Sequence, residues 1–161
     1  MMKYLILSIA LITRLIGYSQ EHESPLKKDN TIIIGVDTQK KAGLPNDVLF
    51  KHFTGSLVDE GYTIAKEDKE RFTFSTESKE MKYLKNYNFI LRGRIKDGKI
   101  YLTAQWSSNL ALSMGGVSSQ GSTFEWHYVK AKNITNGRLY KELIEIVNVY
   151  CPTCPIGYLK K

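Results

Sequence analysis

The clearest hydrophobic pattern in the chain is a pair of alternating segments, residues 88–96 and 99–106, on either side of Asp97-Gly98. Asp-Gly between two such runs is a strong signal for a two-residue β-hairpin turn, because both turn residues adopt positive φ. A two-residue loop fixes the register, so residues whose numbers add up to 195 are expected to pair. On one face the expected pairs are mainly apolar: Phe89 with Trp106, Leu91 with Ala104, Gly93 with Leu102, and Ile95 with Ile100. This face is therefore predicted to join the core.

The opposite face of the same hairpin is polar and basic. Arg92, Arg94 and Lys96 belong to it on the first strand, and Tyr101 and Gln105 belong to it on the second. An antiparallel sheet commonly buries one face and leaves the other in water. The pattern is thus compatible with an ordinary solvated face or with a face that binds anions.

Residues 107–123 are rich in serine and glycine and separate this hairpin from a further strand over residues 124–132. Seventeen structureless residues are unusual in a compact domain, so we expect either a frayed hairpin that turns at residues 115–116 or a functional loop. In the following strand His127 lies between Trp126 and Tyr128 and is expected to face away from them. The candidate ligand-binding residues are Arg92, Arg94, Lys96, Tyr101, Gln105 and His127.

Two segments have the apolar spacing of amphipathic helices, residues 45–60 and 136–150. Gly61 is expected to end the first helix. Gly55 lies inside it, where glycine costs about 1 kcal/mol relative to alanine, so we expect it to mark close packing. Thr135 or Asn136 is expected to cap the second helix.

The remaining strand patterns complete the predicted fold. Residues 31–36 form a β-branched run that indicates a strand covered on both faces or a central strand of the sheet. Residues 62–65 and 71–76 flank a charged turn at 66–70 and predict a second hairpin. The order β-α-β-β-β-β-(β)-α predicts an α+β two-layer sandwich, with an antiparallel sheet of about five strands and both helices on one face.

The N-terminal nineteen residues have the layout of a secretory signal peptide. Lys3 precedes an apolar run at residues 4–12, and the small residues Gly17 and Ser19 stand where a signal peptidase cleaves. The run is too short to span a bilayer, which takes about 20 residues, and no later segment is long and apolar enough. We therefore expect an exported protein, periplasmic or secreted. Because no cysteine lies near residue 20, we do not expect a lipid anchor.

The predicted organisation follows from these patterns. Residues 1–19 are the signal peptide, 20–30 a flexible lead-in, 31–150 a single α+β domain, and 151–161 a C-terminal tail that contains two cysteines. A mature chain of this length is sufficient for one domain with its own core.

Charge adds one indication about partners. The 161 residues include 23 Lys and Arg and 16 Asp and Glu, a net charge of +7, and removal of residues 1–19 leaves +5. This balance favours an anionic polymer or lipid surface as partner. The chain has no block of five or six like charges, so a mixed solvated surface is the alternative, and no nucleic-acid partner is expected.

Cys151-Pro152-Thr153-Cys154 is the only motif with chemical content. Two cysteines at this spacing can close on each other in an oxidising compartment. A redox-active pair needs a thiolate stabilised by a helix N-terminus, whereas this motif follows the end of a predicted helix. We predict a local structural disulfide, with thiol exchange, metal binding and intermolecular pairing as alternatives. The sequence contains no nucleophile elbow, phosphate loop or metalloprotease helix, so no catalytic residue, cofactor or metal is expected.

The stretch Leu57–Thr76, LVDEGYTIAKEDKERFTFST, resembles the helix-then-hairpin segment of small bacterial envelope domains such as the BamC-type lipoprotein domain of outer-membrane assembly. In that segment a helix ends at glycine and is followed by a strand, an acidic turn and a strand that ends in threonine. The resemblance implies an envelope scaffold or binding domain without catalysis. We therefore expect an exported, non-enzymatic binding or scaffold domain whose partner is an envelope protein or an anionic surface. A thiol–disulfide protein that uses Cys151 and Cys154 is the alternative.

Overall fold

A computed structural model of the protein describes residues 25–26, 28–35, 44–108, 113–114, 117–118, 122–128 and 134–160. The predicted signal peptide, most of the predicted lead-in and parts of the 107–123 segment lie outside these residues. The elements in chain order are β1 (Thr31–Gly35), α2 (Asn46–Asp59), β2 (Ile64–Asp68), β3 (Thr73–Thr76), β4 (Lys79–Met81), β5 (Leu84–Lys96), β6 (Lys99–Ser108), β7 (Ser113–Met114), β8 (Val117–Ser118), β9 (Thr123–Glu125), α3 (Ile134–Tyr150) and β10 (Ile156–Leu159).

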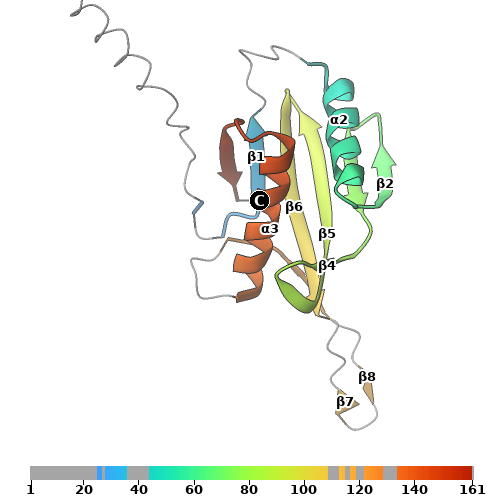
Figure 1. Cartoon of the computed structure of the whole chain (residues 1–161), viewed down its shortest axis with the longest axis vertical. Coiled ribbons are helices and arrows are strands. Elements are labelled where there is room, and N and C mark those ends of the chain that lie inside the picture. The colour runs from blue at the N-terminus through green and yellow to red at the C-terminus, as the bar shows by residue number, and fades with distance from the viewer. Residues whose placement is uncertain are drawn as a thin grey trace, which may run out of the picture.

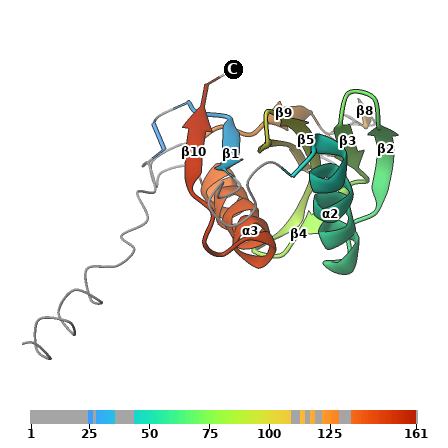
Figure 2. The ribbon, with the colours of Figure 1, turned by 90° about the horizontal axis from the view of Figure 1, so that it is seen from above.

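One antiparallel sheet organises the molecule (Figure 1). Six of its strands follow the order β10-β1-β6-β5-β3-β2, while β4 pairs with β5 and β9 pairs with β6. Both helices lie on the same side of the sheet, as the view from above shows (Figure 2). Over the described residues the structure is therefore α+β with a large antiparallel sheet and two helices, as the sequence predicts.

The central hairpin has the predicted register. Phe89 pairs with Trp106, Gly93 with Leu102, and Ile95 with Ile100. At the turn, Asp97 and Gly98 have φ values of 52° and 67°, as a two-residue turn of this type requires. The turn also meets the start of α2, because the backbone N–H of Gly98 donates to Oδ1 of Asn46 at 3.2 Å.

The prediction of about five strands is wrong, because the described residues already form a sheet of eight. Neither β4 nor β10 is predicted from the sequence. β4 is three residues long and begins with the charged pair Lys79-Glu80, so it shows no alternation. β10 has four residues and extends the sheet beyond β1, in the segment predicted as a tail. Short strands of this kind form because a neighbouring edge is available, not because their own pattern demands it.

Helix α2 begins and ends within one residue of its predicted bounds. Gly61 ends it with φ 76°: its N–H donates to Val58 O, and the next N–H, of Tyr62, donates to Leu57 O. The expectation that Gly55 marks close packing is wrong, because Gly55 is exposed and, apart from its own stretch of helix backbone and its chain neighbours, no described atom lies within 4 Å of the place where a Cβ would stand.

Helix α3 begins at Ile134, two residues earlier than predicted, so Thr135 and Asn136 lie in its first turn and do not precede it. Asn136 is buried and binds both tryptophans. Its Oδ1 accepts the indole N–H of Trp106 at 3.0 Å, and its backbone oxygen accepts that of Trp126 at 3.2 Å. Asn136 therefore joins the start of α3 to β6 and to the residue that follows β9.

The second hairpin is confirmed, but its turn is displaced along the chain. Strand β2 continues to Asp68, and the turn covers residues 69–72 in place of 66–70. Asp68 Oδ1 accepts the backbone N–H groups of Glu70 and Arg71 at 3.1 and 3.0 Å, which holds the turn at residues 69–72.

Helices and sheet share one core on the helix side. The apolar face of the central hairpin is buried, and the stripes of both helices pack on it. The largest fully buried side chains include Trp126, Phe53, Phe89, Leu91, Leu102 and Leu139. The other face of β2, β3, β5 and β6 is not covered by either helix (Figure 2).

Candidate functional site

The predicted polar face of the hairpin is present, and we call it the open face. Arg92, Arg94 and Lys96 are exposed on β5, at alternate positions between buried residues. Arg94 pairs with Tyr101 of β6, and its guanidinium carbon lies 5.4 Å from the centre of the tyrosine ring. This arrangement holds the guanidinium over an aromatic face, a favourable cation–π geometry.

The six predicted ligand-binding residues do not form one cluster. Arg92, Arg94 and Tyr101 lie on neighbouring positions, and Lys96 is beside Lys99 at the end of the hairpin. Gln105 pairs with Ile90 and with Glu125 on the other side, farther along the sheet.

His127 lies beyond the end of β9, at residues that are no longer strand. Its Nε2 lies 3.5 Å from Nδ2 of Asn136 in α3. This contact brings the ring to the end of a helix that covers the opposite side of the sheet. His127 therefore stands apart from the arginines with which the sequence groups it.

Two further residues, Lys66 and Ser75, lie on the open face and are not predicted to do so from the sequence. Lys66 of β2 pairs with Ser75 of β3, and Ser75 pairs with Arg92 of β5. The alternation within residues 71–76 places Ser75 on the other face of the sheet from the buried Phe74. The sequence gives no signal for which residue of β5 it meets, because β4 and a turn intervene.

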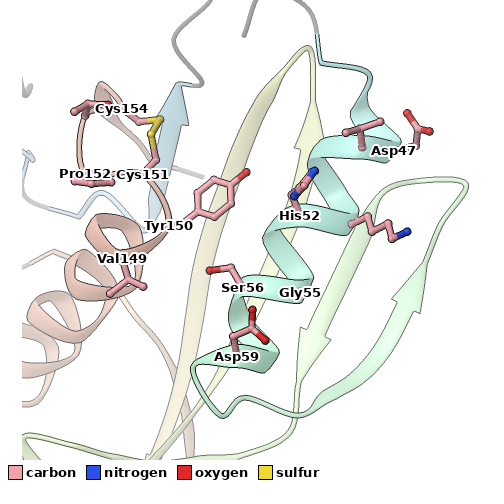
Figure 3. Close-up of a pocket in the computed structure, with 13 residues that line it drawn as sticks. Asp47, His52, Gly55, Ser56, Asp59, Val149, Tyr150, Cys151, Pro152 and Cys154 are labelled. Atoms are coloured by element: carbon pink, nitrogen blue, oxygen red, sulfur yellow. A yellow bond between two sulfur atoms is a disulfide. The ribbon is translucent and has the colours of Figure 1, made fainter. Parts of the chain in front are cut away.

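A groove runs between α2 and the end of α3 (Figure 3). Its volume is about 990 Å³. Tyr150 points from α3 towards α2, and its ring meets that of Phe53 edge-on at 4.8 Å. The lining combines carboxylates, a lysine and a histidine from α2 with the two cysteines: Asp47, Lys51, His52, Asp59, Cys151 and Cys154.

Cys151 and Cys154 have their Sγ atoms 2.03 Å apart, the distance of a disulfide bond. Cys151 donates its N–H to Val147 O at the end of α3, and Cys154 is only 2% exposed. Directly after it, Pro155 O accepts the N–H of Gly35 at 2.9 Å, where β10 joins β1. The helix C-terminus is the negative end of the helix dipole and does not favour a thiolate at Cys151.

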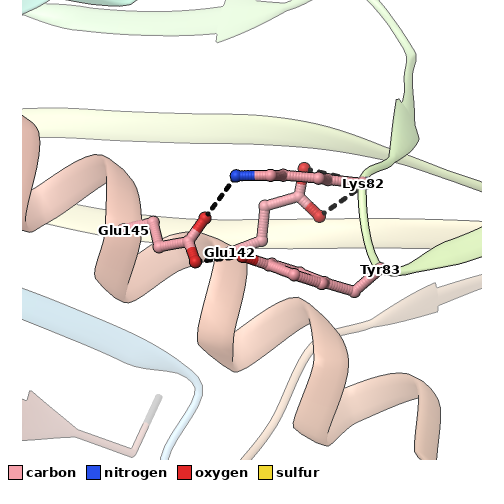
Figure 4. Close-up of polar contacts among 4 residues, drawn as sticks. All are labelled: Lys82, Tyr83, Glu142 and Glu145. Atoms are coloured by element: carbon pink, nitrogen blue, oxygen red, sulfur yellow. Dashed lines mark hydrogen bonds and ion pairs between the residues drawn. The ribbon is translucent and has the colours of Figure 1, made fainter.

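A group of polar contacts fastens the turn between β4 and β5 to α3 (Figure 4). Glu142 is 5% exposed, and its two carboxylate oxygens accept the backbone N–H of Lys82 at 3.3 and 3.1 Å. Glu145 accepts the hydroxyl of Tyr83 and forms an ion pair with the Lys82 ammonium at 3.2 Å.

These contacts shift the pKa values of the two glutamates in opposite directions. Burial raises the pKa of Glu142, and the hydrogen bond from the Lys82 backbone opposes that shift without cancelling it. The hydrogen bond from Tyr83 lowers the pKa of Glu145, with a further contribution from Lys82. The cluster therefore has a structural explanation as an attachment of α3.

No known protein-family model matches this chain, and no curated protein matches it significantly. Across the described residues there is no group of three or more His, Cys, Asp or Glu side chains placed to hold a metal ion. None of the described helices is long and apolar enough to cross a membrane.

Proposed function

We propose that this protein is an exported, non-enzymatic binding module of the bacterial cell envelope and that it binds an anionic partner through its open face. The observation that carries the proposal is the pair of exposed guanidiniums of Arg92 and Arg94 on the side that neither α2 nor α3 covers. Guanidinium groups match carboxylate and phosphate geometry with two parallel hydrogen bonds. The net charge of +5 that remains after removal of residues 1–19 favours the same partners.

The envelope location rests on the sequence. The N-terminal nineteen residues have the signal-peptide layout, and residues 57–76 resemble the helix–hairpin segment of BamC-type domains. A disulfide-distance cysteine pair is compatible with an oxidising compartment. These three observations support export to the periplasm or the medium.

Export is tested by expressing the full chain in a bacterial host with a C-terminal tag. We expect the protein in the periplasmic or medium fraction, with a new N-terminus at Gln20 by mass spectrometry. Leu7→Arg and Leu11→Arg together interrupt the apolar run and should retain the uncut chain in the cytoplasm. An uncut wild-type chain in the cytoplasm would overturn the export proposal.

Binding is tested by pull-down of the full chain from envelope extract and by titration with anionic polymers. Arg92→Glu/Arg94→Glu should lose at least ten-fold in affinity, because it replaces two cations by two anions on one face. The matched control Lys51→Glu/Arg138→Glu makes the same charge change on the exposed surface of the two helices. Equal losses in both variants would show that net charge, and not the open face, is responsible.

A further inference from the structure

Three donor side chains lie in one line across three neighbouring strands. Lys66 pairs with Ser75, and Ser75 pairs with Arg92, so all three occupy the same row of the sheet. Neighbouring strands are about 4.8 Å apart, so the row spans about 10 Å. Residues paired in this way project from the same face. Phe74, the residue before Ser75, is buried on the helix side, which places the row on the open face.

The row crosses a hollow in the open face. The hollow has a volume of about 460 Å³ and lies over β2, β3 and β5. No residue of α2 or α3 lines it, in agreement with its position on the uncovered side. Besides the three donors, its lining includes Thr73 and the two acidic residues Glu67 and Asp68.

The cations of the row are available for a ligand. Asp68 is already held by the N–H groups of Glu70 and Arg71, and its Oδ2 lies 3.8 Å from Nε of Arg71. Within the part of the chain that the structure describes, neither Lys66 nor Arg92 forms an ion pair. The second acidic lining residue, Glu67, lies 3.7 Å from Nζ of Lys69. Lys66 and Arg92 therefore provide two exposed positive charges, with the Ser75 hydroxyl between them, that neither acidic residue pairs with.

We propose that the Lys66–Ser75–Arg92 row is a phosphate subsite, and that its ligand is a soluble polymer that carries phosphate groups. This inference rests on the proposed function of the open face and specifies its ligand. A phosphate group presents several oxygens in different directions, which an ammonium, a hydroxyl and a guanidinium can bind at once. The ligand of the row is therefore defined by its chemistry, a tetrahedral oxyanion.

The surroundings of the row favour a polymer over a lipid surface. Arg94 and Lys96 continue along β5 at intervals of about 7 Å, so a chain of anions meets further cations beyond Arg92. Peripheral membrane binding uses buried apolar groups in addition to basic residues. The exposed large apolar residues of the described chain are Leu26, Val58, Phe124, Val149 and Leu159, and none lines the hollow.

The test is a titration of the full chain with long-chain inorganic polyphosphate, with poly-glutamate of matched length and with vesicles that contain anionic phospholipid. Lys66→Gln/Arg92→Gln should weaken polyphosphate binding about ten-fold and reduce the slope of log K against log salt by about 2. Ser75→Ala should weaken polyphosphate binding about three-fold and should not change the slope of log K against log salt. Lys51→Gln/Arg138→Gln, with the same loss of charge on the helices, should leave both quantities almost unchanged.

Each other outcome has a defined meaning. If Arg92→Glu/Arg94→Glu abolishes binding but Lys66→Gln and Ser75→Ala do not affect it, the open face binds anions and the phosphate row is wrong. If poly-glutamate binds with the same affinity as polyphosphate, the proposal that the ligand carries phosphate groups is wrong. If the protein binds vesicles and does not bind polyphosphate, the proposal that the ligand is a soluble polymer is wrong. Unchanged thermal unfolding of each variant confirms that a loss of binding is not a loss of folding.

Discussion

Packing around Gly93 leaves no room for a side chain. It pairs with Phe74 of the neighbouring strand, and a Cβ at this position would lie 2.2 Å from Cε1 of the phenylalanine ring. That ring cannot swing away freely, because Phe53 and Phe50 lie against it at centroid distances of 5.7 and 6.3 Å. We expect Gly93→Ala to lower the free energy of unfolding by roughly 1–3 kcal/mol, measured by urea denaturation.

Gly55 supplies the matched control for this prediction. It is a helical glycine with open space around its Cβ position, so Gly55→Ala should raise the free energy of unfolding by about 1 kcal/mol. Phe74→Leu in the Gly93→Ala background should recover part of the loss. If Gly93→Ala is as stable as the wild type, the close approach of Phe74 is not present in solution.

Glu142 and Glu145 give opposite dependences of stability on pH. The raised pKa of Glu142 means that its contribution is full below the ordinary glutamate pKa, about 4.3, and is lost as pH rises through the folded value. Glu142→Gln should therefore gain stability relative to the wild type as pH rises from 4 to 7, and its amide oxygen can still accept the Lys82 N–H. Melting temperatures across this range measure the trend.

Glu145→Gln provides the comparison, because the contribution of Glu145 to stability changes with pH in the opposite direction to that of Glu142. The lowered pKa of Glu145 stabilises the fold above about pH 4.3 and this contribution is lost as pH falls through the folded value. Glu145→Gln should therefore lose stability relative to the wild type as pH rises. Parallel curves for the two variants would contradict the different environments of the two carboxyl groups.

At the scale of elements, the disulfide connects the end of α3 to the start of β10. The bond closes a loop of four residues, for which loop closure predicts about 2 kcal/mol of stabilisation. We expect Cys151→Ala/Cys154→Ala to lose about this amount. The loss should be accompanied by faster hydrogen exchange at the β10 amides, because Pro155 and β10 are the segment directly after the bridge.

The central hairpin serves as the reference for that experiment. Its exchange should remain slow in the double variant, since β5 and β6 pair along ten positions and bury their apolar face. Uniform acceleration across the sheet would mean that the bridge stabilises the whole fold and does not specifically hold β10. Full binding activity in the same variant would remove the thiol–disulfide alternative.

At the scale of the whole molecule, stability and the proposed binding are located on opposite sides of the sheet. The helix side contains the core, while the open face has exposed cations between buried positions. We therefore expect Arg92→Glu/Arg94→Glu to change the free energy of unfolding by less than about 1 kcal/mol. Thermal unfolding measures this, and a large loss would show that the arginines also support the fold, for example through Arg94 on Tyr101.

The local pattern determined a large part of this fold. The register of residues 88–106 follows from a two-residue turn, whose geometry leaves only one pairing. Helix α2 and its end at Gly61 follow from apolar spacing and from the preference of glycine for positive φ. The alternation along residues 91–96 likewise established that the arginines share a face apart from the core.

The tertiary structure decided which distant segments meet. Strands β4 and β10 have too few residues to show a period, and they form because β5 and β1 offer free edges. The position of Ser75 between Lys66 and Arg92 depends on β3 pairing with β5 across an intervening strand and turn. A sequence determines turns, helices and faces through neighbouring residues, whereas contacts between strands far apart in the chain depend on how the whole sheet assembles.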